Sequence, residues 1–138
     1  MTAQPDQTVL IVDDEETILR LMTRALEKEN VRVLAAPDTA SARALFAAHE
    51  GEIVLVVLDV TLADGDGAET LLPEFVARRP KVRVVVASGG EPPEAVTAEL
   101  TRIDGHFLRK PFLPKQLIRL VREAAPPRSS VADATDRS

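Results

Sequence analysis

The segment Ile53-Val54-Leu55-Val56-Val57-Leu58-Asp59 carries the strongest strand signal in the chain. Residues 53–58 are all apolar, which is typical of a parallel strand buried on both faces of its sheet. Asp59 ends the run, and a buried carboxylate is costly unless another group pairs with it. We therefore expect a sheet that helices cover on both sides, with Asp59 as a functional residue at the end of one strand.

Shorter apolar runs alternate with helical patterns along the rest of the chain. The expected strands cover residues 8–12, 31–36, 53–58, 82–87 and 106–109. The expected helices cover residues 16–29, 39–49, 68–79, 92–103 and 114–125. Five strand–helix units joined by short loops predict an α/β fold. At this size we expect a flavodoxin-like, doubly wound, five-stranded parallel sheet in the order 2-1-3-4-5, with helices on both faces.

Details within the expected helices are open to test. Asp38 can cap the second helix, in which one face is expected to hold Ser41, Leu45 and Ala48. Pro73 lies inside the third helix and should kink it or shift its start. The last helix is expected to bury Leu117, Leu120, Val121 and Ala124.

Composition indicates a single small globular domain. The chain has 138 residues, of which 45% are hydrophobic, and a formal net charge of -5 that argues against a nucleic-acid surface. No cysteine is present, no apolar stretch approaches the roughly 18 residues of a membrane span, and no secretory signal precedes the first strand. We expect a domain over residues 8–125, flexible termini at 1–7 and 126–138, a cytoplasmic location and no contact with membranes.

Chemistry-bearing residues follow three of the expected strands. Asp13 and Asp14 follow the first strand, Asp59 ends the third and Lys110 follows the fifth. The carboxyl ends of parallel strands line one crevice, so these four side chains should meet there. Clustered carboxylates repel one another unless a cation is present, and oxygen ligands suit Mg²⁺. Lysine suits a phosphate group. The sequence therefore predicts a site for Mg²⁺-dependent phosphoryl chemistry.

The same segments resemble those of a known family. They are Val12-Asp13-Asp14-Glu15, Leu58-Asp59, Asp66-Gly67, Ala87-Ser88-Gly89 and Phe107-Leu108-Arg109-Lys110-Pro111-Phe112. Residues 8–125 thereby resemble the receiver domain of two-component response regulators, either a single-domain receiver or one attached to a hybrid kinase.

The resemblance implies a role for each matching residue. Asp59 would accept a phosphoryl group from a sensor histidine kinase or a histidine phosphotransfer protein and so form an aspartyl phosphate. The metal ligands would be Asp14, Asp13 through water, Asp59 and the main-chain carbonyl of Thr61. Ser88 and Lys110 would bind the phosphoryl group. Phe107 would be the aromatic switch residue that signals to a downstream protein target, and the Lys110-Pro111 peptide bond would be cis. The domain would catalyse its own phosphorylation and dephosphorylation without being an independent enzyme.

Simpler interpretations of single residues compete with these roles. Asp13 and Asp14 could cap the first helix, and Glu15 suits its first turn better than a ligand role. Ser88 could be a turn residue. Phe107 by itself would be a core aromatic residue. Asp64 and Asp66 fit turn and cap positions better than metal ligation.

Two other functions remain possible for the chain as a whole. A phosphotransferase of the haloacid-dehalogenase type usually has a second aspartate two residues after its nucleophile, where this chain has Thr61. A pseudo-receiver would bind partners without accepting phosphate, but Asp14, Asp59, Ser88 and Lys110 are all present.

Departures from the family pattern bear on rigidity and assembly. Ala63 stands where proline is common, so the loop after Asp59 should be less rigid. His106 replaces an acidic residue that transcription-factor members often carry before the switch aromatic. The dimer that such an acid stabilises is therefore not expected, and the unphosphorylated chain should be a monomer.

Overall fold

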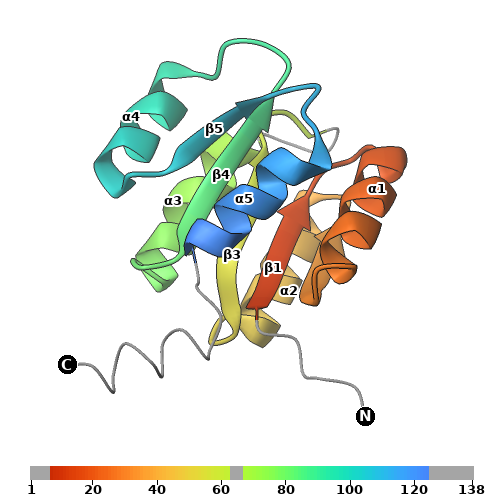
Figure 1. The fold of residues 1–138 in the computed structure, drawn as a ribbon. Helices are drawn as coiled ribbons and strands as arrows, with labels where there is room; N and C mark the ends of the chain where they lie inside the picture. The colour runs from red at the N-terminus through yellow and green to blue at the C-terminus, as the bar shows by residue number, and fades with distance from the viewer. Residues whose placement is uncertain (1–6, 63–66, 125–138) are drawn as a thin grey trace, which may run out of the picture.

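Five parallel strands form one sheet in the order β2-β1-β3-β4-β5, with helices on both sides (Figure 1). The computed structural model describes residues 7–62 and 67–124. The strands are β1 (Gln7–Val12), β2 (Val31–Ala36), β3 (Ile53–Asp59), β4 (Arg83–Ser88) and β5 (His106–Arg109). The helices are α1 (Glu16–Glu27), α2 (Thr39–His49), α3 (Ala68–Arg78), α4 (Glu94–Ile103) and α5 (Pro114–Ala124). The predicted fold class and strand order are confirmed.

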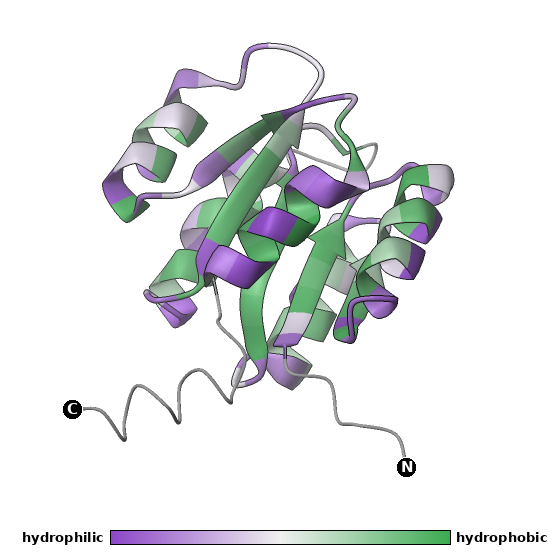
Figure 2. Ribbon diagram, in the orientation of Figure 1, coloured by the Kyte–Doolittle hydropathy of each residue, from purple (hydrophilic) through white to green (hydrophobic). Residues whose placement is uncertain are grey.

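Alternation along the central strands divides the core into two layers. In β3, Leu55 and Val57 pack toward α1 and α5, whereas Val56 and Leu58 pack toward α2, α3 and α4. The strands in the middle of the sheet are hydrophobic along nearly their whole length (Figure 2). Since successive side chains of a strand point to opposite faces, a run that is apolar throughout requires cover on both sides.

Helix α2 confirms the predicted cap and shows which face enters the core. Asp38 caps it as expected: its carboxylate accepts the Ser41 backbone N–H at 2.8 Å. The Ser41 hydroxyl donates to the same carboxylate at 2.6 Å. The hydrogen bonds from this hydroxyl and from the Ser41 N–H lower the pKa of Asp38. The buried residues of α2 are Ala42 and Phe46, whereas Leu45 of the expected face is only partly buried, so the face of Ser41, Leu45 and Ala48 is not the one that enters the core. Phe46 stacks on Phe75 of α3 with ring centroids 4.1 Å apart, and this contact selects the face.

Most other differences are shifts at element ends. Helix α1 ends at Glu27 rather than at residue 29, and β4 covers residues 83–88 rather than 82–87. Pro73 lies inside α3 without moving its start from Ala68. In α5, Leu117 and Val121 are buried, but Leu120 is only partly so.

The termini and one loop lie outside the described residues. These include the expected flexible segments, the turn residues Asp64 and Asp66, and Ala63. Gln7 is the exception among residues 1–7, because it begins β1 and its side-chain amide donates to the Val121 carbonyl at 3.1 Å. Across residues 7–62 and 67–124, no helix has the length and apolar character of a membrane span. The cytoplasmic location stays a prediction.

Gly67 brings the start of α3 against the end of β3. Its φ is 60°, a left-handed backbone conformation that glycine adopts without strain. A Cβ atom there would lie 2.6 Å from the carbonyl oxygen of Asp59 and 2.7 Å from that of Val60. Only glycine allows this approach, so Gly67 helps to position the backbone that carries Asp59.

We expect Gly67→Ala to lower the free energy of unfolding by about 1–3 kcal/mol, because it combines a strained φ with a backbone clash. Urea unfolding followed by circular dichroism would measure the change. Gly51→Ala is the matched control, since a Cβ there meets nothing within 4 Å and its φ is not positive. Equal effects of the two substitutions would contradict this role for Gly67.

Candidate functional site

The strand ends that were expected to meet do so at the crevice between β1 and β3. Val12 and Leu58 are register partners, so Asp13 and Asp59 follow side by side. The main-chain hydrogen bonds between neighbouring strands continue past the strand ends. Beyond β1 and β2, the Asp13 N–H donates to the Ala36 carbonyl at 3.0 Å, and beyond β4 and β5, the Lys110 N–H donates to the Ser88 carbonyl at 2.8 Å. These main-chain bonds fix where the functional side chains start.

The ammonium group of Lys110 binds the two buried carboxylates. Its Nζ lies 2.8 Å from Asp13 Oδ2 and 3.0 Å from Asp59 Oδ2. Asp13 is 3% exposed and Asp59 is 7% exposed, so the three charged groups form a largely desolvated cluster. Charge-assisted hydrogen bonds of this kind are stronger than neutral ones.

Burial and charge act in opposite directions on these groups. Burial raises the pKa of Asp59 above its usual value, and the negative charge of Asp13 adds to this rise, although the hydrogen bond from Lys110 opposes it. Burial alone would lower the pKa of Lys110, but the hydrogen bonds and charges of Asp13 and Asp59 outweigh it and raise that pKa. Lys110 is therefore a permanent cation, whereas the ionised form of Asp59 is held at a cost.

The donor set fits a small divalent cation. Asp13, Asp14 and Asp59 each place one carboxylate oxygen within 4.8 Å of the others. Oxygens on opposite sides of a Mg²⁺ ion lie about 4.2 Å apart, so three of them can share one ion after a small adjustment. Asp14 is exposed, which leaves room for the waters that Mg²⁺ usually keeps.

Thr61 and Ser88 border the same crevice. The Thr61 N–H donates to Asp59 Oδ1 at 3.3 Å. Ser88 is buried, and its Oγ accepts the Gly90 N–H at 3.1 Å. The metal-ligand role of the Thr61 carbonyl and the phosphate-binding role of the Ser88 hydroxyl stay predictions. The Lys110-Pro111 peptide bond is cis, as expected.

Phe107 lies on the surface of the edge strand and is not a core residue. Its side chain is 36% exposed, and its register partner in β4 is Val86. The neighbouring His106 is exposed as well. The interpretation of Phe107 as an ordinary core aromatic was therefore wrong.

Glu15 is a site residue that sequence reasoning missed. Its carboxylate Oε1 lies 3.5 Å from Lys110 Nζ, on the same ammonium group that Asp13 and Asp59 bind. Because Glu15 and Lys110 are 95 residues apart in the chain, no local pattern could reveal the contact.

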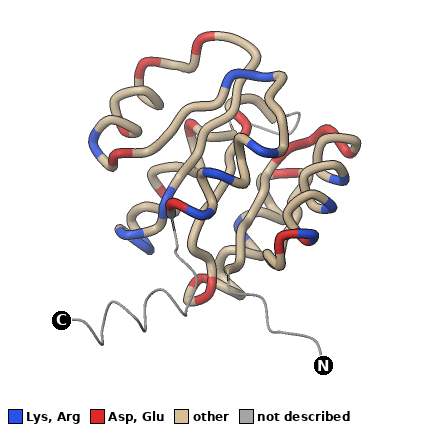
Figure 3. Tube along the Cα trace, viewed as in Figure 1, with Lys and Arg blue, Asp and Glu red and all other residues tan. Residues whose placement is uncertain are grey.

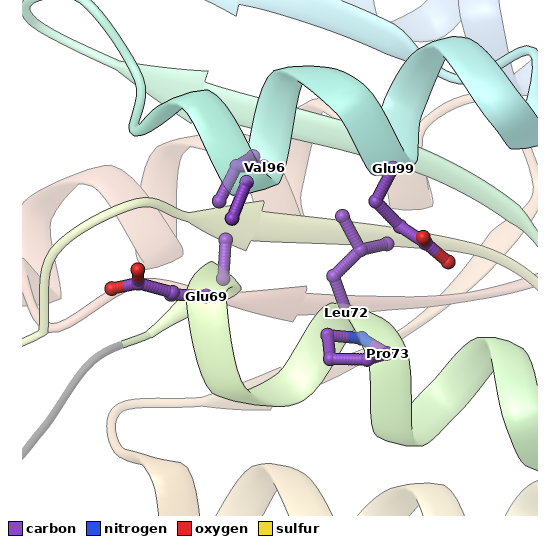
Figure 4. A pocket seen from close by; sticks show the side chains of 7 residues that line it. Glu69, Leu72, Pro73, Val96 and Glu99 are labelled. Carbon is purple, nitrogen blue, oxygen red and sulfur yellow. The ribbon is translucent and has the colours of Figure 1, made fainter.

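One hollow borders the cluster, and a second lies between two helices. One, of about 310 Å³, lies between α1 and the segment after β5, and Glu15, Ile18, Leu21, Lys110 and Phe112 are among its lining residues. The other, of about 220 Å³, lies between α3 and α4. In Figure 4 its apolar floor includes Leu72 and Val96, and the Glu69 and Glu99 carboxylates lie toward its opposite ends.

Known proteins share this sequence and fold. The chain is 31% identical over 135 residues to the transcriptional regulatory protein CssR of Bacillus subtilis, covering 87% of this chain and 55% of CssR. It is 34% identical over 118 residues to the sensor kinase CckA of Brucella abortus, covering 84% of this chain and 12% of CckA. It thus spans about half of the first relative and a small part of the second.

Two solved receiver structures match over nearly their full length. A response regulator receiver domain protein from Clostridium thermocellum superposes with a TM-score of 0.73 at 25% identity, covering 86% of this chain and 93% of that one. The receiver domain of NtrX from Brucella abortus does so with a TM-score of 0.71 at 32% identity, covering 84% and 96%.

The family itself is matched across most of the described residues. The sequence model of the response regulator receiver domain matches residues 9–122, which include every strand end that builds the crevice. With the fold, the acidic cluster and the relatives in agreement, the chain belongs to the response regulator receiver domain family.

Proposed function

We propose that the chain accepts a phosphoryl group on Asp59 from the phosphohistidine of a sensor histidine kinase or a histidine phosphotransfer protein. The observation that carries this proposal is the buried Asp59 carboxylate, which shares Lys110 with Asp13 at the crevice. In the reaction, an Asp59 oxygen forms a bond to phosphorus while the bond from phosphorus to the histidine nitrogen breaks. The electron pair of that bond stays on the imidazole.

The neighbouring residues suit the charge that develops on the phosphoryl oxygens. Lys110 would exchange part of its contact with Asp59 for a phosphoryl oxygen, and the Ser88 hydroxyl would donate to another. Mg²⁺ bound by Asp13, Asp14, Asp59 and the Thr61 carbonyl would neutralise negative charge at the same place. The chain therefore has every residue that this proposed chemistry requires.

The competing functions have less support. At the position of the second aspartate of a haloacid-dehalogenase-type enzyme, Thr61 offers no carboxylate, and its N–H is bonded to Asp59. A pseudo-receiver would not need the ion pair between Lys110 and Asp59, which persists here. We infer a self-phosphorylating receiver rather than an independent enzyme.

The hollow beside Lys110 is a suitable docking place for the phosphodonor protein. Ile18, Leu21 and Phe112 make it apolar, and Leu21 is 49% exposed although it is a large hydrophobic residue. Contiguous exposed apolar surface often marks a protein interaction site. A partner seated there would hold its phosphohistidine close to Asp59.

The output would involve α4, β5 and α5. Phosphorylation would draw the Ser88 hydroxyl inward, and the exposed Phe107 ring could then move behind β4. The hollow between α3 and α4 would let α4 shift. We further propose that residues 8–125 form the functional domain, and that it is a monomer before phosphorylation.

Phosphate uptake tests the proposal directly. We expect the protein to gain one phosphate with Mg²⁺ and acetyl phosphate, and Asp59→Asn to gain none, as read by intact mass. Asp104→Asn is the control, because it makes the same isosteric change at the end of α4. Uptake at an unchanged rate in Asp59→Asn would refute Asp59 as the acceptor.

The Asp59→Asn substitution, which should abolish phosphate uptake, should at the same time make the folded protein more stable. The pKa of Asp59 is raised by burial, so its ionised form lowers the free energy of unfolding at pH values above the folded pKa. This loss disappears below the unfolded pKa of about 3.9. Without metal, we expect Asp59→Asn to raise the melting temperature at pH 7, and the gain to shrink toward pH 4. A lower melting temperature at pH 7 would contradict the direction of the pKa shift.

The output face can be tested by NMR. Beryllofluoride with Mg²⁺, a mimic of the phosphoryl group, should shift amide signals around His106 and Ile118 and at the buried Val96. In Phe107→Ala we expect these distant shifts to shrink while the shifts near Asp59 persist. Shifts in the wild type that stay confined to the loops around Asp14, Asp59 and Ser88 would exclude Phe107 as the switch.

A further inference from the structure

The carboxylate of Glu15 faces the cation that the phosphoryl group needs. Its Oε1 lies 3.5 Å from Lys110 Nζ, and its side chain is 63% exposed, so it stands on the solvent side of the cluster. Asp13 and Asp59 hold the same ammonium group from the buried side. A donor that approaches Lys110 from solvent therefore meets Glu15 on its way.

The position of Glu15 is fixed by the site itself. Its backbone N–H donates to Asp13 Oδ1 at 2.8 Å, which holds the residue beside the crevice. Glu15 is the N-cap residue of α1, but its side chain makes no capping hydrogen bond. The carboxylate is thus not needed to complete the helix, and its contact in this part of the structure is with Lys110.

Charge at the mouth of the site is unbalanced. Figure 3 shows acidic residues gathered where β1 leads into α1. One carboxylate oxygen each of Asp13, Asp14 and Asp59 lies within 4.8 Å of the others, where a single cation could bind all three, and Glu15 is not in this group. Its negative charge remains when that cation is bound.

We propose that Glu15 determines phosphodonor specificity by charge. It competes with the incoming phosphoryl group for Lys110 and repels small donors that carry two negative charges. Donors of lower charge, or protein donors that bring their own cation to Glu15, are disfavoured less. The inference deepens the proposed function and rests on Asp59 as the acceptor.

A charge series at position 15 tests the proposal. Phosphorylation of the wild type, Glu15→Gln and Glu15→Arg is followed by intact mass at saturating Mg²⁺ and pH 7; the chain has no tryptophan to report by fluorescence. With acetyl phosphate, a dianion, we expect Glu15→Gln to react about two- to fivefold faster, the range for an exposed charge contact, and Glu15→Arg faster still. With phosphoramidate, which carries less charge, the gains should be smaller.

Salt provides a second readout. Screening weakens the repulsion, so the difference between the wild type and Glu15→Gln should narrow as ionic strength rises. A purely structural role of Glu15 would produce neither the dependence on donor charge nor the dependence on salt.

Glu16 supplies the matched control. It is adjacent, lies in the first turn of α1, and pairs with Arg20 at 3.4 Å rather than with Lys110. Equal gains in Glu16→Gln and Glu15→Gln would reduce the effect to net charge and overturn the proposal, as would an unchanged or slower rate in Glu15→Gln. If one of these results is found while the wild type takes up phosphate normally, only this inference fails. If the wild type takes up no phosphate at all, the proposed function fails as well.

Discussion

The ion pairs of Lys110 with Asp13 and Asp59 hold together three segments that are far apart in the chain. Lys110 lies 97 residues from Asp13 and 51 from Asp59, and both acids are buried. Two buried carboxylates side by side would repel each other without a cation between them, and removing one partner of a buried pair leaves an uncompensated charge. The order of the sheet, which places β1 beside β3, makes this arrangement possible.

The same cluster sets stability against function. Burial raises the pKa of Asp59, so folding makes ionisation of the carboxylate that would attack phosphorus less favourable than it is in the unfolded chain. Gly67, by contrast, serves both the fold and the site, because the close approach of α3 to the Asp59 carbonyl excludes any side chain there.

Around this buried centre lie the exposed residues of the proposed input and output surfaces. Glu15, Leu21 and Phe112 border the hollow beside Lys110, where a donor would approach. Phe107 lies on β5, at the edge of the sheet next to β4. Ser88 connects the two regions, since it ends β4 and its carbonyl accepts the Lys110 N–H. This short segment therefore joins the crevice to the edge strand.

The order of strands, the two-sided core and the meeting of Asp13, Asp59 and Lys110 could all be predicted from the sequence. Runs that are apolar at every position indicate strands buried on both faces, and short βα connections restrict the topology, which brings the strand ends to one crevice. The buried face of α2, the exposure of Phe107 and the contact of Glu15 with Lys110 could not. Small residues leave the helical pattern of α2 ambiguous until Phe46 meets Phe75. Phe107 and Glu15 depend on packing between segments distant in the chain, which only the tertiary structure decides.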